Sequence, residues 1–504
     1  MNAIDSYLNR TTMYRLTLYV LIGLLISAGL FAVLGFMPFS LLSLLFSILL
    51  LSIAAWATNM VFAYCFEVPA NTESFWISAL ILALILSPPS SMDDALNLFW
   101  AVVLTMASKY IFALHNKHLF NPVAFAVSIT ALVLGFAPSW WVGSRIMLPL
   151  VLLGGFLIVK KLRRADLPLS FLAVSGLVVA SSSVVKGDYW VGSLGHLIFD
   201  SPWIFFATVM LTEPLTTPPT GIYRILYGAF TGLLFAPQFH VFSWYPSPEN
   251  ALVIANLFSY AVSPKEKLML KLKEKIEVAP NLYDFVFEKN RQVHYLPGQY
   301  MEWTLGLNRA DSRGNRRYFT LASSPTEPDI RIGVRFYDRP SRFKQTLLAI
   351  EPGHTLLAGQ TAGDFTLPDN VKTRLVFIAG GIGITPFRSM VKFLLDTNTA
   401  RDITLMYSNK TAEEILYTDI FDQARQRLGL KTVYTLTDPH GVPPNWAGAV
   451  GRIDEQSIVS TVPDYKEARF YISGPNAFVT SIESILHRLG IPRAHIVTDY
   501  FPGY

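Results

Sequence analysis

The chain contains a single cysteine, Cys65, among its 504 residues. This scarcity excludes a disulfide within the chain, a four-cysteine iron–sulfur cluster and a cysteine zinc site. Histidine is also rare, and its nine copies do not form the matched pairs on two apolar segments that a haem between membrane helices requires. We therefore predict no metal site in this chain and expect any metal cluster to lie on a partner.

Charged side chains are scarce as well: they make up 15% of the residues, hydrophobic residues make up 52%, and the mean hydropathy is +0.38. These values lie outside the usual range of soluble enzymes. The formal net charge of +5 is typical of basic loops on the cytoplasmic side of a membrane protein. We expect a membrane protein with no nucleic-acid partner.

Long apolar runs fill the first half of the chain, and a helix needs about 20 apolar residues to cross a bilayer. Runs of this kind, some of them shorter, lie at 15–36, 38–64, 75–88, 96–114, 121–138, 146–160, 168–185, 201–212, 223–243 and 250–263. They predict a transmembrane bundle of about ten helices over residues 1–263. Short runs flanked by proline, such as the one before Pro88 and Pro89, can instead be half-helices that line a site.

Basic residues predict the orientation of this bundle. Arg10 and Arg15 precede the first run, and Lys160, Lys161 and Arg164 follow the sixth. The even number of crossings between them places both groups on the cytoplasmic side, together with both termini. The first run is too long for the core of a signal peptide. We expect a multi-pass protein of the cell inner (cytoplasmic) membrane, with the second half of the chain in the cytoplasm.

From residue 264 the pattern changes to that of a soluble α/β protein. Alternating strands at 271–277, 284–288, 300–305 and 330–336 predict a small antiparallel β-barrel over residues 264–370. Strands at 375–379, 403–407, 431–437 and 469–472, separated by glycine turns and helical segments, predict an α/β domain with a parallel sheet over residues 371–504.

The barrel segment contains a cation, two aromatic rings and a hydroxyl in one short run, Arg317-Tyr318-Phe319-Thr320. A flavin dinucleotide uses an arginine for its pyrophosphate, an aromatic surface for stacking, and a hydroxyl with backbone groups for the electron-accepting edge of its ring. Further candidate groups are Ser323, Ser341, Lys344 and Gly363. This combination predicts an FAD site.

A second nucleotide site is predicted by residues 380–386 (GGIGITP), which follow a strand and open a helix. Glycines let the backbone approach a pyrophosphate, and the helix N-terminus stabilises the anion. The candidate NAD(P)-binding residues are Gly380, Gly381, Gly383, Thr385 and Pro386.

Coenzyme specificity should depend on the end of the second strand of the parallel sheet. Ser408 and Lys410 could bind the 2′-phosphate of NADPH, whereas an acid there would favour NADH, and the first acid is Glu413. The preference leans towards NADPH, and both coenzymes stay open.

The order of these motifs resembles the ferredoxin–NADP reductase superfamily over residues 265–504. The resemblance implies that Arg317, Phe319 and Thr320 form the flavin motif, with phenylalanine in place of the usual tyrosine. It also implies that Ser473, Gly474 and Pro475 form the loop under the nicotinamide, with Ser473 in place of a frequent cysteine. Terminal Tyr504 would cover the flavin until nicotinamide displaces it, or would simply end a strand.

Two polar, proline-bearing loops interrupt the apolar half, at 115–122 (HNKHLFNP) and 212–221 (TEPLTTPPTG). With the hydropathy pattern they resemble the membrane subunit family of NqrB and RnfD, from the sodium-pumping quinone reductase and the Rnf complex. This resemblance implies ten helices and FMN joined to a threonine by a phosphoester. The family's acid before proline is Asp, whereas here it is Glu213, and the best candidate hydroxyl is Thr220. A covalent FMN, a noncovalent FMN or riboflavin, and a bundle that binds nothing remain alternatives.

The sequence thus predicts a membrane-bound NAD(P)H oxidoreductase that passes electrons through FAD into the transmembrane domain. The expected partners are the bilayer and an extracytoplasmic flavoprotein or other electron carrier, with a membrane quinone next. Two alternatives are a subunit of a pump that couples electron flow to Na⁺ or H⁺ movement, and a cytoplasmic flavoreductase with a membrane anchor.

Overall fold

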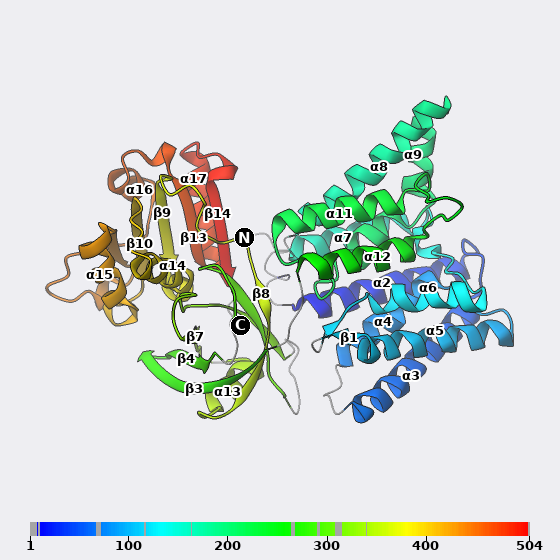
Figure 1. Ribbon diagram of the computed structural model, residues 1–504, viewed down its shortest axis with the longest axis horizontal. Helices are drawn as coiled ribbons and strands as arrows, with labels where there is room; N and C mark the ends of the chain where they lie inside the picture. The colour runs from blue at the N-terminus through cyan, green and yellow to red at the C-terminus, as the bar shows by residue number, and fades with distance from the viewer. Residues whose placement is uncertain are drawn as a thin grey trace. The chain divides into compact units, whose positions relative to one another are not determined.

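The computed structural model describes residues 8, 11–66, 72–114, 117–162, 164–263, 268–289, 293–307, 315–338 and 340–501. The chain divides into two compact units, Ile4–Glu266 and Lys267–Tyr504 (Figure 1). We call the first the helical unit and the second the sheet unit. Several residues singled out above lie outside the described residues: Arg10, His115, Asn116 and Tyr504.

The helical unit consists of helices that follow the apolar runs. They are α2 (Met13–Val33), α3 (Leu41–Cys65), α4 (Thr72–Ile85), α5 (Met92–Ile111), α6 (Pro122–Leu134), α7 (Leu148–Leu162), α8 (Asp166–Lys186), α9 (Trp190–Phe199), α10 (Trp203–Phe205), α11 (Gly221–Phe235) and α12 (Pro248–Val262). A π-helical turn, η2 (Phe206–Met210), continues α10, and a 3₁₀ turn, η1 (Trp141–Gly143), precedes α7. Two short strands, β1 (Ala113–Leu114) and β2 (Lys117–His118), pair in the loop between α5 and α6.

Among the described residues, three helices are long and apolar enough to cross a membrane: α2, α3 and α8. The bundle of about ten crossings is therefore not confirmed; α4, α6, α9 and α11 are apolar but shorter. Helix α9 was not expected. His196 lies in the last turn of this helix.

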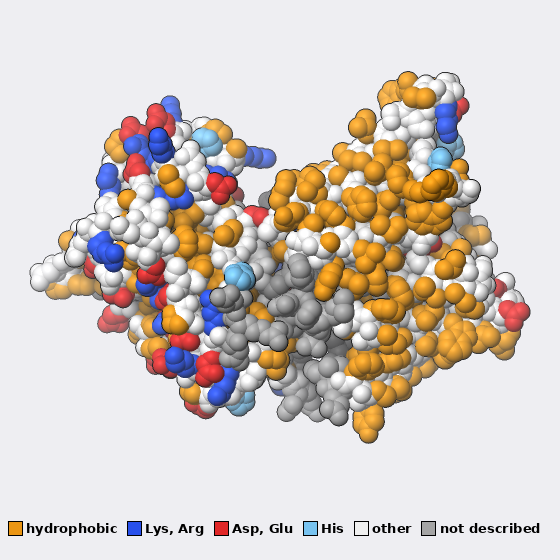
Figure 2. Space-filling model, viewed as in Figure 1, with side chains coloured by type: hydrophobic (Ala, Val, Ile, Leu, Met, Phe, Trp, Pro, Cys, Tyr) orange, Lys and Arg blue, Asp and Glu red, His pale blue; other side chains and the backbone are white. Residues whose placement is uncertain are grey.

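The outer surface of the helical unit is apolar. Ile26 is 69% exposed and Leu42 is 78% exposed, although both lie on long apolar helices. Figure 2 shows that on the visible face apolar side chains cover this unit, whereas charged side chains gather on the sheet unit. Helices that are apolar on all sides are typical of a membrane-embedded protein.

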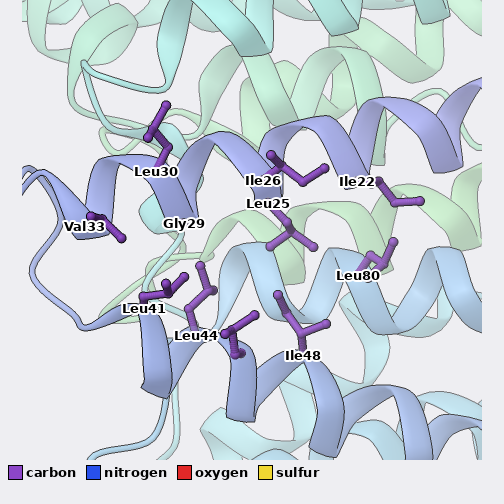
Figure 3. Close-up of a pocket in the computed structure, with 11 residues that line it drawn as sticks. Ile22, Leu25, Ile26, Gly29, Leu30, Val33, Leu41, Leu44, Ile48 and Leu80 are labelled. Atoms are coloured by element: carbon purple, nitrogen blue, oxygen red, sulfur yellow. The ribbon is translucent and has the colours of Figure 1, made fainter.

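An apolar groove of about 390 Å³ lies between α2, α3 and α4 (Figure 3). Leu25 of α2, Leu44 of α3 and Leu80 of α4 line it, and Gly29 leaves room between the first two helices, since a Cβ there would lie 3.1 Å from Leu41 Cδ1. Its lining fits an apolar chain and offers no side-chain polar group.

Helix α4 ends at Ile85, ahead of the two prolines that the sequence suggested as a break. The loop before α7 closes this end: the Trp140 backbone N–H donates to the Ile85 carbonyl at 2.8 Å, and Trp141 Nε1 donates to the carbonyls of Ala83 and Leu86 at 3.1 and 3.0 Å. The carbonyl groups of Ala83, Ile85 and Leu86, which have no partner within a helix, are thus satisfied by the protein.

The first sheet of the sheet unit is antiparallel, with strand order β6-β5-β8-β3-β4-β7. Its strands are β3 (Leu268–Ala279), β4 (Leu282–Glu288), β5 (Tyr300–Thr304), β6 (Arg316–Thr320), β7 (Asp329–Arg335) and β8 (Thr355–Ala362), with α13 (Arg342–Ala349) between the last two. Alternate residues of β7 face the core. The closed barrel is not confirmed: between the ends of this sheet, the described residues form one isolated bridge, Leu321 with Ile332.

The second sheet is parallel throughout, with strand order β12-β11-β10-β9-β13-β14 (Figure 1). Its strands are β9 (Leu375–Gly380), β10 (Ile403–Asn409), β11 (Lys431–Leu436), β12 (Ala449–Val450), β13 (Arg469–Pro475) and β14 (Ile496–Phe501). The connecting helices are α14 (Thr385–Asp396), α15 (Thr418–Leu428), α16 (Glu455–Thr461) and α17 (Asn476–Arg488). Strands β9 and β10 are buried along their whole length, as expected when helices cover both faces of a sheet.

Strand order reverses between β9 and β13. From β9 the chain proceeds through β10 and β11 to one edge of the sheet, then returns to β13 beside β9 and continues to β14 at the other edge. In open α/β sheets, ligands bind outside the carboxyl ends of the strands at such a switch point. The fold therefore indicates a binding site where β9 and β13 end.

Candidate functional site

The glycine-rich loop and the loop at Ser473 meet at this switch point. Gly380 ends β9, and Ser473, Gly474 and Pro475 end β13. A Cβ on Gly383 would lie 2.3 Å from the Ser473 carbonyl oxygen and 2.6 Å from the Gly474 Cα, so only glycine fits there. A Cβ on Gly380 would lie 2.9 Å from the Phe478 ring. The two loops predicted to bind the coenzyme are thus packed backbone to backbone.

Helix α14 starts directly after the glycine loop. Pro386 occupies its first turn, Thr385 Oγ1 donates to the Ile382 carbonyl at 3.2 Å, and no side chain caps the helix N-terminus. Gly381 has φ +53°, a conformation in which a side chain is strained. Uncapped N–H groups behind a glycine turn fit a pyrophosphate.

The Ser473 side chain is fully buried, and its Oγ has no hydrogen-bond partner among the described residues. In the sheet, Ser473 pairs with Asp499 of β14. Thr320 Oγ1 donates to Asp499 Oδ2 at 3.4 Å, which brings the end of β6, the strand of the predicted flavin motif, close to β14. Asp499 thus links Thr320 to the strand that carries the buried Ser473 hydroxyl, a polar group that could bind a nicotinamide.

Asp499 is a site residue that sequence reasoning missed. Its signal in the sequence was a lone acid within the last strand, and the pairing of β13 with β14 was needed to bring it beside Ser473.

Strand β6 presents the flavin motif on two faces. In the sheet, Arg317 pairs with Trp303 and Phe319 pairs with Met301, and the side chains of Trp303 and Met301 are fully buried. Arg317 is only 5% exposed, and its guanidinium carbon lies 5.1 Å from the centre of the Phe343 ring. Tyr318 points the other way: it is 52% exposed and its hydroxyl donates to Glu302 Oε2 at 2.7 Å. A stacking role therefore fits Phe319 better than Tyr318.

The start of α13 supplies a second anion site beside this motif. The buried Ser341 caps the helix, since its Oγ accepts from the Lys344 backbone N–H at 3.3 Å. Lys344 Nζ donates to the Arg335 carbonyl at 2.9 Å, so this ammonium already holds the end of β7. Gly363 has φ +111°, and a Cβ there would lie 2.9 Å from the Tyr300 ring. The buried cation of Arg317, the helix N-terminus and this close approach fit a flavin dinucleotide.

Ser323, predicted to bind FAD, lies instead at the junction of the two sheets. Its Oγ accepts from the Arg331 N–H at 2.9 Å and lies 3.0 Å from the Tyr295 hydroxyl, and its carbonyl accepts from Ser389 Oγ at 2.6 Å. A binding role for this hydroxyl stays a prediction, with these structural contacts already made.

An ion pair reinforces the same junction. Arg388 of α14 donates from Nη1 to Glu327 Oε2 at 2.8 Å and from Nη2 to Oε1 at 3.0 Å, and also binds the Ala322 carbonyl at 2.7 Å. Burial alone would raise the pKa of Glu327, but the hydrogen bonds and charge of Arg388 outweigh it and lower that pKa below 4.5. Neither residue was singled out from the sequence, because their contact depends on how the two sheets pack.

Near the predicted specificity site, Ser408 is 7% exposed while Lys410 is exposed. The Lys410 backbone N–H donates to Glu414 Oε2 at 3.4 Å. The carboxylate of Glu414 therefore lies at the turn where an acid would favour NADH, although Glu414 comes four residues after Lys410 in the chain.

In the helical unit, Thr220 precedes α11 and its Oγ1 is buried without a hydrogen-bond partner among the described residues. Arg224, in the first turn of α11, donates from Nε to Asp166 Oδ2 at 2.8 Å and from Nη1 to the Pro219 carbonyl at 3.0 Å. A buried hydroxyl next to an arginine fits attachment of a phosphate.

The loops at 115–122 and 212–221 meet through Asn121 and Glu213. Asn121 Nδ2 donates to Glu213 Oε2 at 2.9 Å, and the Asn121 backbone N–H donates to Asn256 Oδ1 at 2.7 Å. Asn256 Nδ2 donates to the Tyr227 hydroxyl at 2.8 Å. The two loops compared with NqrB and RnfD therefore form one buried polar network.

Comparison with known proteins bears on the sheet unit. A family model described as the oxidoreductase NAD-binding domain matches residues 377–484, within the parallel sheet. The chain is 27% identical over 218 residues to a flavohemoprotein of Rhodopirellula baltica, covering 41% of this chain and 53% of that protein. It is 28% identical over 213 residues to the glycine betaine monooxygenase reductase subunit of Chromohalobacter salexigens, covering 41% and 56%.

Among solved structures, the chain is similar to the Amycolatopsis cytochrome P450 reductase GcoB, with a TM-score of 0.42, 21% identity and coverage of 47% of this chain and 70% of that one. The chain spans about half the length of the curated relatives it matches. The matching domain confirms the prediction of an FAD-dependent NAD(P)H oxidoreductase in the second half of the chain. The NqrB/RnfD-like membrane domain and the individual site residues stay predictions.

Proposed function

We propose that the chain is a membrane-bound NAD(P)H oxidoreductase whose electrons pass from NAD(P)H through FAD into the helical unit and on to an extracytoplasmic or membrane acceptor. The observation that carries this proposal is the contact of Thr320 with Asp499 opposite the buried Ser473, because it joins a flavin motif to a dinucleotide loop. FAD supplies the chemistry of accepting a hydride and releasing single electrons.

The residues of the sheet unit have distinct roles in this proposal. Arg317 and the N-terminus of α13 bind the pyrophosphate of FAD, and Phe319 stacks on it. The loop at 380–383 and the start of α14 bind the coenzyme pyrophosphate. Ser473 Oγ orients the nicotinamide, and its burial together with that of Thr320 keeps water from the site of hydride transfer.

The helical unit carries the second half of the proposal. Its apolar surface supports a place in the inner membrane, and Thr220 supports a membrane flavin, FMN or riboflavin, held covalently or noncovalently. Denaturing the full chain and identifying the released flavins and any flavin left on the polypeptide distinguishes these states. Thr220→Ala should remove a covalent flavin, whereas Thr216→Ala in the same loop should keep it.

Reconstituted vesicles test the proposed route. With the sheet unit outside and ferricyanide trapped inside, we expect NADH or NADPH added outside to consume the oxidant. A chain lacking residues 1–263 would still reduce a membrane acceptor if the helical unit were only an anchor, and should fail to reduce it under this proposal.

Lys410→Ala should lower the preference for NADPH over NADH, as measured by the ratio of turnover with the two coenzymes. An unchanged ratio would remove Lys410 from the site.

Coupling to ion movement is a second candidate, favoured by one buried acid. Glu249, in the first turn of α12, is 2% exposed, and its Oε2 accepts from Trp140 Nε1 at 3.2 Å. Buried carboxylates in membrane helices are typical of ion pathways. Vesicles should then take up Na⁺ or H⁺ during NADH oxidation and lose this uptake in Glu249→Gln; electron transfer without uptake in the wild type would exclude it.

A further inference from the structure

The guanidinium of Arg335 lies against the glycine loop that is expected to bind the coenzyme. Arg335 ends β7, and its Nη1 would be 3.6 Å from a Cβ on Gly381. Two residues earlier, a Cβ on Gly333 would lie 2.8 Å from Thr385 Cγ2 and 3.2 Å from Ile382 Cδ1. Strand β7 of the antiparallel sheet therefore packs directly on the loop and on the start of α14.

A carboxylate from the parallel sheet holds this guanidinium. Arg335 Nη1 donates to Glu414 Oε2 at 3.1 Å, and Nη2 donates to Glu414 Oε1. The side chains of Arg335 and Glu414 are 20% and 15% exposed. Glu414 belongs to a short turn, η4 (Ala412–Glu414), which follows β10. The pair is thus bidentate, mostly buried, and placed between the pyrophosphate loop and the turn at Lys410.

A pyrophosphate bound on the glycine loop would compete with Glu414 for the guanidinium of Arg335. The guanidinium of arginine binds phosphate oxygens in the same forked geometry as a carboxylate. The Glu414 carboxylate and a pyrophosphate carry the same charge and would compete for one cation, and at close range in a partly buried site they repel each other.

We infer that Arg335 binds the pyrophosphate of the nicotinamide coenzyme and that Glu414 holds it until the coenzyme arrives. The inference rests on the proposed function, because it places the same coenzyme on the same loop. Arg335 is then a coenzyme-binding residue, and Glu414 is a positioning residue that weakens coenzyme affinity by competing for it.

The pair is not needed to keep the two sheets together. Arg388 with Glu327, the Ser389 hydroxyl with the Ser323 carbonyl, and the Tyr417 hydroxyl with Asp284 Oδ1 at 2.6 Å all cross the same junction. Arg335 can therefore leave Glu414 while the junction stays intact.

Calorimetric titration of the full chain, purified in detergent with FAD, tests this competition without turnover. ADP-ribose contains the adenosine and the pyrophosphate but no nicotinamide, and adenosine contains no phosphate. We expect Glu414→Gln to bind ADP-ribose about fivefold more tightly and Arg335→Ala to bind it at least about tenfold more weakly, with adenosine unaffected in both. The double variant should behave as Arg335→Ala, because the carboxylate acts only through the arginine.

Glu327→Gln is the matched control, since it disturbs the other ion pair of the junction and should leave the affinity for ADP-ribose unchanged. Arg335→Lys, which keeps the charge without the fork, should fall between wild type and Arg335→Ala. Unchanged or weaker binding in Glu414→Gln, or an equal gain in Glu327→Gln, overturns the inference. ADP-ribose binding needs no electron acceptor. The binding result can therefore be interpreted even if the proposed electron route proves wrong.

Discussion

Thr320 and Asp499 are the residues through which β6, the strand of the predicted flavin motif, reaches the parallel sheet. Their side chains are 3.4 Å apart, and Asp499 pairs in the sheet with the buried Ser473. A hydroxyl that is held by a carboxylate is oriented, because its hydrogen points at one acceptor and its lone pairs are left for a ligand. The rate of hydride transfer should therefore depend on this contact.

We expect Thr320→Ala to slow the reduction of bound flavin by NADH about 10- to 100-fold, since an oriented group at the reacting edge is lost. Thr320→Ser keeps the hydroxyl and should stay within about threefold of wild type. The rate is measured by stopped-flow flavin absorbance without oxygen. Equal rates in wild type and Thr320→Ala would show that this hydroxyl does not act on the flavin.

The pair of Glu327 and Arg388 makes stability depend on acid. The folded pKa of Glu327 lies below its ordinary value of 4.5, so its ionised form stabilises the fold at every pH above about 4.5, and this stabilisation is lost as the pH falls through the folded pKa. Glu327→Gln should lower the free energy of unfolding by about 1–3 kcal/mol at pH 7.

That difference should shrink as the pH falls below about 4.5 and through the folded pKa of Glu327, because protonation removes the same charge from the wild type. Urea unfolding of the full chain, followed by the fluorescence of released FAD, measures it at each pH. Asp402→Asn, which breaks an exposed pair with Arg374, provides the control with little expected change. If the difference in unfolding free energy between wild type and Glu327→Gln stayed constant with pH, the ionised Glu327 would not be the source of this stability.

Secondary structure elements followed the sequence closely where one pattern dominated. The expected strands at 375–379 and 403–407 appear as β9 and β10, because continuous buried β-branched and aromatic residues leave few alternatives. Helix α9 and the turn at Glu414 were missed, since neither has a strong periodic pattern of its own. The contacts of Ser323 with Ser389, of Arg335 with Glu414 and of Glu327 with Arg388 could not be predicted, because each crosses between two sheets whose packing no local pattern encodes.

Helix α13 offers a prediction at the scale of an element, through its cap Ser341. Asparagine and aspartate cap helices about as well as serine, so both variants should keep the helix. Ser341→Asp also adds a negative charge where the flavin pyrophosphate is expected, and should weaken FAD binding by at least about tenfold, whereas Ser341→Asn should change it little. Equilibrium dialysis of FAD measures both, and equal affinities would place the pyrophosphate elsewhere.

The glycine loop gives a second prediction of this kind. In Gly383→Ala the new methyl group would collide with the Ser473 carbonyl, which belongs to a buried strand and cannot easily move. We expect ADP-ribose binding to fall at least about tenfold while FAD stays bound. Gly306→Ala is the control, since nothing lies within 4 Å of its Cβ. Normal ADP-ribose binding in Gly383→Ala would mean that the loop can open without cost.

At the scale of the whole molecule, one polypeptide combines an apolar helical unit with a reductase of ordinary surface polarity. The number of flavins per chain is the property that separates an electron-conducting helical unit from an inert one. We expect purified full-length chain to contain one dissociable FAD and a second flavin, as measured by chromatography after denaturation. A single FAD per chain would leave the helical unit without a carrier.

The carboxyl end of α4 has a consequence for such a protein. Two neighbouring tryptophans occupy the carbonyl groups of Ala83, Ile85 and Leu86, which would otherwise have to be hydrated. Within a bilayer, where no water is available, these three carbonyl groups would therefore need no hydration. If the helical unit carries electrons across a bilayer, as we propose, the closed end of α4 would help to keep ions from crossing beside them.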